Sequence, residues 1–273
     1  MYVFITASNS LYRSSMDYNV LMAKKRGGFD KVLAYDFETM IDTEFRKRND
    51  TILSIKQGAG LWLWKPYFIH KALIEECAEG DIYLDAAAFF ISDVRMIEKV
   101  MDDDIYATCL PYIEADWTKS EAFDIMDMDK EVYKNSFQYQ ASFMAFRKSM
   151  RSIMFVEEWL NNCCNPDLIN PAQNIGKQIE TFQNHRMDQS CFSLLCKKYN
   201  VSPHKDPTQF GIWGYPEVRG ARYVGVKMKN EYPIVIVLHR LKDFGLRNKL
   251  RLVKRTMCLI SKNIIKNIRR KRC

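Results

Sequence analysis

The chain has 273 residues, of which 47% are hydrophobic and 13% aromatic, with 11 glycines and 8 prolines. This composition suffices for one large folded domain and excludes collagen-like and linker-rich classes. The net charge of +8 is uneven: residues 240–273 hold 13 Lys and Arg and one acid, whereas the remainder holds 28 Lys and Arg and 32 acids. We therefore expect an anionic partner for the basic tail, and no nucleic acid on the acidic body.

Alternating strand and helix patterns run through the first 110 residues. In chain order we predict a strand at 2–8, a helix at 17–29, a strand at 30–36, a helix at 65–80, a strand at 81–85, a helix at 91–101 and a strand at 104–110. Such alternation predicts an α/β fold with a mostly parallel sheet covered by helices on both faces. Ligands bind such sheets at the carboxyl ends of strands, where Ser8 and Asp85 are expected.

The second half is more helical. Helices are predicted at 148–164 and 188–199, and one strand at 233–238. No linker composition occurs before about residue 240, so we predict one domain over residues 1–240 and a basic, amphipathic tail over 241–273. Eight scattered cysteines without a CxxC pair indicate reduced thiols, and no window approaches the roughly 20 apolar residues of a membrane span. These features predict a cytoplasmic protein.

Several well-known catalytic motifs are missing. The sequence lacks GxxxxGK[ST], a GxGxxG after a strand, GxSxG and HExxH, which argues against P-loop kinases, dinucleotide dehydrogenases, α/β-hydrolases and zincins.

Three isolated residues could carry chemistry, and each also has an ordinary structural interpretation. Asp85 follows a strand and precedes three alanines, so it could bind Mg²⁺ or Mn²⁺ carrying a diphosphate, or cap a turn. Lys65 begins a helix and could meet a phosphate, or be solvated beside core tryptophans. His239 follows a strand and could be structural, or complete a metal site begun by Asp85.

The densest polar cluster is "NHRMDQS" at 184–190. Asp188 alone could be a helix N-cap. However, an N-cap needs one polar group, and five of different chemistry indicate a site for a hydroxylated ligand. The five are His185, Arg186, Asp188, Gln189 and Ser190.

The motifs "GAGLWLWKPYFIHKAL", "GDIYLDAA", "QYQASFMAFRKS" and "HRMDQS" follow one another in this order. Over about residues 1–200 the chain thereby resembles bacterial and viral GT-A-fold glycosyltransferases of surface-polysaccharide (capsule or lipopolysaccharide) biosynthesis. The resemblance implies a GT-A-like fold. It also implies transfer of a hexose from a nucleotide sugar, expected to be a UDP-sugar, to a lipid-linked or oligosaccharide acceptor.

The resemblance also implies site residues. The nucleotide and its diphosphate would be held by Thr6, Ala7, Ser8, Tyr12, Lys65 and Asp85. The third-strand motif of the family is usually Asp-x-Asp and binds a divalent cation, Mn²⁺ or Mg²⁺. Here it is Asp85-Ala86-Ala87, without the second acid, and His239 would be the remaining metal ligand.

Asp188 and Gln189 correspond to the family's catalytic position. They resemble the donor-sugar contact of retaining enzymes, while inverting enzymes have a general base nearby, so the stereochemistry stays open. His185 and Arg186 would bind the sugar together with Asp188. The missing acid at position 87 favours an alternative, a non-catalytic glycosyltransferase-like binding or scaffold protein. The intact "HRMDQS" and "WKP" favour the enzyme.

The tail combines an apolar stripe with many basic residues. Residues 246–270 are predicted to form a helix on an anionic membrane surface, which would place the protein at the inner face of the cell membrane. The alternative for this segment is an ordinary helix packed on the domain. A nucleic-acid-binding arm is a third possibility, but it would not need an apolar stripe.

Overall fold

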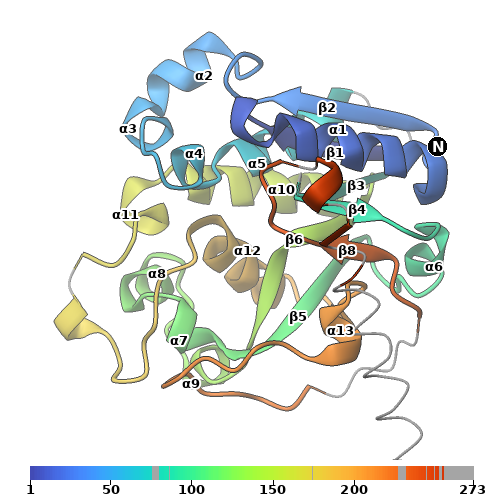
Figure 1. The fold of residues 1–273 in the computed structure, drawn as a ribbon. Coiled ribbons are helices and arrows are strands. Elements are labelled where there is room, and N and C mark those ends of the chain that lie inside the picture. The colour runs from blue at the N-terminus through green and yellow to red at the C-terminus, as the bar shows by residue number, and fades with distance from the viewer. Residues whose placement is uncertain are drawn as a thin grey trace, which may run out of the picture.

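The computed structural model describes residues 1–75, 80–85, 87–173, 175–226, 232–243, 245–248, 250, 251 and 254. Its centre is a six-stranded sheet of order β2-β1-β3-β6-β5-β7 (Figure 1). The strands are β1 (Tyr2–Ser8), β2 (Lys31–Asp36), β3 (Gly80–Leu84), β5 (Ile105–Ile113), β6 (Phe137–Arg147) and β7 (Pro203–His204). Strand β6 is antiparallel to both its neighbours and the other pairs are parallel, which confirms the predicted mostly parallel sheet.

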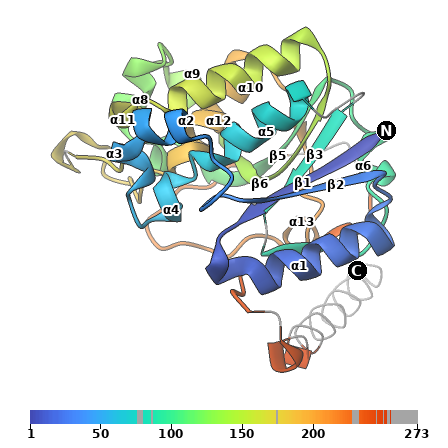
Figure 2. The same cartoon turned by 90° about the horizontal axis from the view of Figure 1, so that it is seen from above.

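Helices cover both faces of this sheet, as predicted. Helices α5 (Trp64–Glu75), α10 (Met150–Cys163) and α12 (Met187–Lys198) lie on one face, and α1 (Arg13–Met22) lies on the other (Figure 2). Strand β1 shows the reason, because its side chains alternate between the faces. Val3 and Ile5 belong to the core beneath α5 and α10, whereas Phe4 packs with Phe90 in a second core on the α1 side.

Two strands differ from the prediction. Strand β6 contains most of the motif "QYQASFMAFRKS", for which the sequence pattern predicts no strand. In the structure it inserts between β3 and β5. The residue pattern of β6 does not indicate a strand, because most of its side chains are buried and it lacks the polar–apolar alternation of a half-exposed strand. The predicted strand at 233–238 is shorter, β8 (Ile236–Leu238), and pairs with β4 (Ala88–Phe90) in a separate two-stranded sheet.

Short helices make up most of the connections. They are η1 (Ser10–Tyr12), η2 (Ala23–Gly27), α2 (Thr43–Arg48), α3 (Asp50–Leu53), α4 (Gly58–Leu61), α6 (Arg95–Glu98), α7 (Glu114–Trp117), α8 (Ser120–Ile125), α9 (Glu131–Lys134), α11 (Pro166–Ile169), η3 (Ile175–Lys177) and α13 (Phe210–Trp213). The predicted helix at 91–101 is therefore reduced to α6, four residues long.

The predicted tail helix lies largely outside the described residues. Of its described residues, 246–248, 250, 251 and 254 are helical, and Leu246 and Leu250 are 75% and 63% exposed. Before them the chain still contacts α1, because the Ser15 hydroxyl donates to the Leu241 carbonyl at 2.6 Å. The domain boundary at 240 stays a prediction. Within the part of the chain that the structure describes, no helix is long and apolar enough to cross a bilayer.

A left-handed turn precedes α5. Residues 58–62 have φ angles of 58°, 49°, 96°, 53° and 63°. Left-handed backbone costs about 1–2 kcal/mol per residue that carries a Cβ, and glycines at 58 and 60 avoid part of that cost. Hydrogen bonds hold the turn: the Gly60 amide donates to Ile55 at 2.7 Å, and the Trp64 indole donates to Gly58 at 2.9 Å. The "GAGLW" motif thus directs the chain into the start of α5.

We predict that Gly60→Ala destabilises the protein by at least about 1–2 kcal/mol, because φ is +96° and a Cβ would lie 2.8 Å from the Leu53 Cα. Chemical denaturation measures the loss. Gly225→Ala is the matched control, since its Cβ would meet nothing within 4 Å and no left-handed φ is involved. Equal stabilities of the two variants would contradict a strained turn.

Candidate active site

A buried lysine joins two predicted site carboxylates. Lys65, in the first turn of α5, is 4% exposed, and its Nζ lies 2.8 Å from Asp188 and 3.6 Å from Asp85. The same ammonium donates to the Ala141 carbonyl of β6 at 2.8 Å. Three segments far apart in the sequence therefore meet at one charge. We call Lys65, Asp85 and Asp188 the Lys65 cluster.

The cluster keeps its lysine charged. Burial by itself lowers the pKa of Lys65, but the carboxylates of Asp188 and Asp85 outweigh burial and raise it above its ordinary value. The interpretation of Lys65 as a solvated residue is therefore wrong. Asp85 is the exposed member, with 32% of its side chain accessible, and it also accepts a hydrogen bond from the Tyr83 hydroxyl at 2.7 Å.

Asp188 is a buried acid and not a helix cap. The N-cap position of α12 is Arg186, and Asp188 lies inside the first turn, 3% exposed. Burial raises its pKa to about 6, even though Lys65 opposes the shift. Since this pKa lies above the ordinary 3.8, the folded state keeps a proton that the unfolded chain loses, and Asp188 weakens the fold as pH rises from about 4 to about 6. The structure thus excludes the N-cap-only alternative.

Gln189 is oriented by strand β6. Its carbonyl oxygen accepts from the Ala141 amide at 3.3 Å, and its amide nitrogen donates to the Gln138 Oε1 at 2.9 Å. The same Gln138 oxygen accepts from an Arg186 Nη at 2.9 Å. Gln138, which was not predicted as a site residue, thereby holds two members of the "HRMDQS" motif in fixed orientation.

A buried ion pair orients Gln138 in turn. The Gln138 Nε2 donates to Glu114 at 3.1 Å, and Glu114, fully buried, is paired with Lys197 and also accepts from the Thr118 hydroxyl at 2.6 Å. Because the carboxylate accepts from the amide nitrogen, the Gln138 oxygen must face Arg186 and Gln189. The sequence signal was a polar residue in an apolar strand, the "QYQ" of 138–140.

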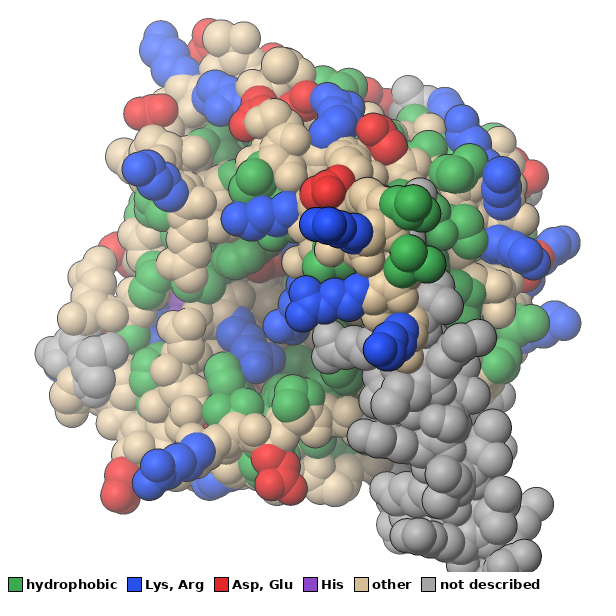
Figure 3. Space-filling model, viewed as in Figure 1, with side chains coloured by type: hydrophobic (Ala, Val, Ile, Leu, Met, Phe, Trp, Pro, Cys, Tyr) green, Lys and Arg blue, Asp and Glu red, His purple; other side chains and the backbone are tan. Residues whose placement is uncertain are grey.

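Arg186 lies on aromatic side chains. Its guanidinium carbon is 3.8 Å from the Trp117 ring centre and 5.0 Å from that of Tyr112. Burial lowers its pKa to about 10, so the side chain stays charged at neutral pH. Trp117 thus packs against this arginine. Figure 3 shows a hollow on this face of the molecule, with Lys and Arg side chains around it.

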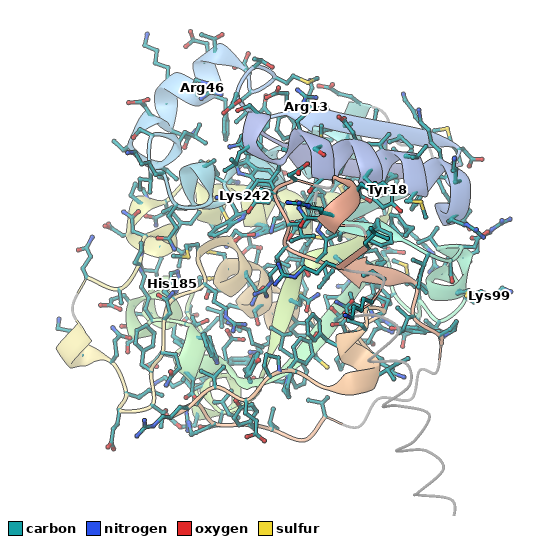
Figure 4. All side chains as sticks on the ribbon, viewed as in Figure 1. Arg13, Tyr18, Arg46, Lys99, His185 and Lys242 are labelled. Atoms are coloured by element: carbon teal, nitrogen blue, oxygen red, sulfur yellow. The ribbon has the colours of Figure 1, made fainter. Side chains whose placement is uncertain are left out.

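His185 is not brought into the Lys65 cluster. Its side chain (labelled in Figure 4) is fully buried, and its Nδ1 accepts a hydrogen bond from the amide of Lys119, the residue before α8, at 3.3 Å. Burial and the nearby charge of Lys119 lower its pKa to about 3. The imidazole is therefore neutral. Its predicted role in sugar binding stays a prediction, and the observed contacts are those of a residue supporting the loop before α12.

The predicted nucleotide residues lie at the end of β1. The residues Thr6, Ala7 and Ser8 are at most 2% exposed, and Tyr12 in η1 is half-buried. The Ser8 hydroxyl contacts the Met16 sulfur at 3.2 Å. This strand end lies at the same sheet edge as Asp85, because β1 and β3 are parallel neighbours. The role of these residues in nucleotide binding stays a prediction.

The predicted metal ligands lie close in the fold. The amide of His239 donates to the Ala87 carbonyl at 3.0 Å, two residues beyond Asp85. His239 Nδ1 accepts from the Leu241 amide at 3.0 Å, so a metal would have to meet Nε2. Burial lowers the pKa of His239 to about 4, so it is neutral. Among the described residues no group of three His, Cys, Asp or Glu side chains could hold a metal ion, and the predicted pair falls one ligand short.

Comparisons with known proteins gave structural matches alone. No family model matches the chain, and no curated protein matches it. It is similar to the apo form of mouse xyloside xylosyltransferase 1, at 10% identity and a TM-score of 0.46, over 89% of this chain and 99% of that one. It is also similar to the apo glycosyltransferase GlyE of Streptococcus pneumoniae TIGR4, at 11% identity and a TM-score of 0.43, over 78% of this chain and 48% of that one. At these scores neither match carries a conclusion about activity.

We predict that Lys65→Met destabilises the protein by about 3–5 kcal/mol, because two carboxylates would lose their shared buried cation. Adding Asp188→Asn to Lys65→Met should recover part of that loss. Lys71→Met, on the same helix, removes an exposed pair with Glu75 and should cost no more than about 0.5 kcal/mol. Denaturant midpoints of the parent, Lys65→Met, Asp188→Asn, their double variant and Lys71→Met test the cluster, and additive single effects of Lys65 and Asp188 would contradict it.

Proposed function

We propose that this protein is a glycosyltransferase that moves a sugar, from a nucleotide donor expected to be a UDP-sugar, onto a hydroxyl of a lipid-linked or oligosaccharide acceptor in surface-polysaccharide synthesis. One observation carries the proposal. At the carboxyl edge of a mostly parallel sheet, Lys65 joins an accessible carboxylate, Asp85, to a buried carboxylate with a raised pKa, Asp188. Carboxylates with perturbed pKa values in such places are typical of reaction sites.

The chemistry fits these groups. The bond between the sugar C1 and the diphosphate oxygen breaks, and its electron pair stays on the diphosphate. The acceptor oxygen bonds to C1 and loses its proton. Ionised Asp188 would either accept that proton or steady the positive charge that develops at C1, and both roles require the ionised form. Because the Lys65 ammonium is already shared by two carboxylates and a carbonyl, its arrangement supports a positioning role for the lysine.

The resemblance to the family implies a divalent cation, Mn²⁺ or Mg²⁺, as one way of neutralising the diphosphate. Asp85 and His239 are the residues that would hold it, with diphosphate oxygens as further ligands.

The chain offers a second candidate function as well. Alanine at position 87 favours a protein that binds a nucleotide sugar without turning it over. Binding without release of nucleotide would support that alternative.

The test is a panel of UDP-, GDP- and CMP-sugars, assayed for nucleotide release with and without Mn²⁺. We expect turnover of one donor, with kcat/KM rising as pH passes about 6, because Asp188 must ionise. His185 and His239 cannot produce this rise, since burial lowers their pKa values to about 3 and about 4.

Asp188→Asn should lower turnover on the order of 10²-fold or more and abolish the rise near pH 6, while nucleotide affinity stays unchanged. Asp93→Asn is the control, because Asp93 is a surface acid paired with Arg95. Failure of every donor to bind would refute the proposed function. An unchanged pH profile in Asp188→Asn would remove Asp188 from the mechanism.

We also propose that the tail attaches the protein to an anionic membrane surface at the cytoplasmic side. The support is its charge, 13 Lys and Arg against one acid over residues 240–273, and the exposure of Leu246 and Leu250. Each basic residue near an anionic leaflet contributes roughly 1 kcal/mol, so several together would hold the protein there. Such a location would suit a lipid-linked acceptor.

Sedimentation with vesicles tests the attachment. The full chain should pellet with vesicles containing anionic lipid, and high salt should release it, because exposed charges are screened. A chain ending at Asp243 should stay in the supernatant. If both chains pellet equally, or neither does, the tail is not the anchor.

A further inference from the structure

Arg186 and Arg240 both lie next to residues of the candidate site, Arg186 at Gln138 and Arg240 at Ala87. Arg186 lies over Trp117 and Tyr112, and its guanidinium donates to a neutral amide, that of Gln138. Arg240 is exposed and follows directly after His239. Within the described part of the chain, neither arginine forms a salt bridge. Burial lowers the pKa of Arg186; Tyr112 and Glu114 partly oppose that shift, and the charge of Arg240 adds to it. Both arginines oppose the burial-driven rise in the pKa of Tyr112.

The backbone brings Arg240 to the place of the missing acid. Its amide donates to the Ala87 carbonyl at 3.2 Å, and its φ of 58° is a left-handed conformation that a residue with a side chain seldom adopts. Residue 87 is where an Asp-x-Asp motif would carry its second carboxylate. This chain therefore has a methyl group at that position and an arginine beside it.

We propose that Arg186 and Arg240 clamp the phosphates of the nucleoside diphosphate and so take the place of a tightly bound divalent cation. The inference rests on the proposed function. Two guanidinium groups at the site, neither in a salt bridge with a described acid, favour an anionic ligand. A guanidinium also matches phosphate geometry with two parallel hydrogen bonds, and the stacking of Arg186 on Trp117 keeps its plane fixed. As C1 departs, the growing charge on the diphosphate meets cations already in place.

The ligand set around Asp85 agrees with this inference. Asp85 is the only acid of the sequence motif, and one of its oxygens already accepts from Tyr83 and faces Lys65. With His239 it makes two protein ligands, where no third is provided by the described residues. Replacing a metal by fixed guanidinium groups removes the need for the missing carboxylate.

Calorimetry of the full chain with UDP and GDP, in EDTA and in Mn²⁺, tests the proposal. We expect one diphosphate to bind in EDTA with an affinity within about threefold of that in Mn²⁺, since no metal is required. Arg240→Gln and Arg186→Gln should each weaken it by about 10- to 100-fold, the range for a charge-assisted hydrogen bond. Lys99→Gln, an exposed cation at the end of α6 (Figure 4), should leave binding unchanged.

Two further arms identify the contacted group. Uridine and guanosine lack phosphates, so their binding should not respond to Arg240→Gln; an equal loss would overturn the phosphate assignment. Ala87→Asp restores the second acid and should make diphosphate binding depend on Mn²⁺. Because Arg240 is exposed, its variant will fold even if that of Arg186 does not. Binding in Mn²⁺ but not in EDTA would overturn the clamp and leave the proposed function standing, whereas no binding in either would refute the proposed function itself.

Discussion

The structure of the candidate site depends on one buried charge. An ammonium group taken out of water costs several kcal/mol unless anions and hydrogen-bond acceptors surround it, so Lys65 obliges its neighbours to supply them. Asp85, Asp188 and the Ala141 carbonyl do so from β3, α12 and β6. The relative placement of these three elements is therefore held by electrostatics as well as by packing. Asp85, the most exposed of these groups, is held in position by its contact with the buried Lys65.

A second buried charge, that of Glu114, also orients side chains of the candidate site. Glu114, paired with Lys197, fixes the orientation of Gln138, and Gln138 in turn fixes Gln189 and Arg186. Hydrogen bonds in such chains leave few rotamers available, so these polar side chains are held before any ligand arrives. Pre-organisation of this kind is what transfer chemistry requires, because groups already oriented need not reorganise during the reaction.

Backbone strain accompanies both parts of the site. The left-handed turn at residues 58–62 leads into Lys65, and Met187, beside Asp188, has a φ of 45°. The two strained segments adjoin, since the Gln57 amide contacts the Met187 sulfur at 3.9 Å. Strained backbone persists where surrounding contacts over-determine it, and such positions cluster at functional sites. Lys65 and Asp188, which follow these two segments in the chain, form an ion pair at 2.8 Å.

Local sequence patterns were enough to predict the α/β class, the helices on both faces and most elements, because apolar periodicity is a short-range property. They also identified Lys65, Asp85 and Asp188 as unusual. Strand β6 escaped prediction, since a strand buried on both faces lacks alternation, and its insertion between β3 and β5 is a long-range pairing. Without β6, neither Gln138 nor the Ala141 carbonyl could be placed in the site.

The sequence by itself determined which residues are candidates: a lysine in "WKP", an acid at the end of "YLD" and a second acid in "HRMDQS". The tertiary structure alone decided their relations. It showed that Asp188 is a buried acid and not a cap, that His185 lies outside the cluster, and that Arg240 lies beside Ala87. The physical reason is that pKa values, ion pairs and burial depend on neighbours in space, and these neighbours are 66 to 153 positions apart in the chain.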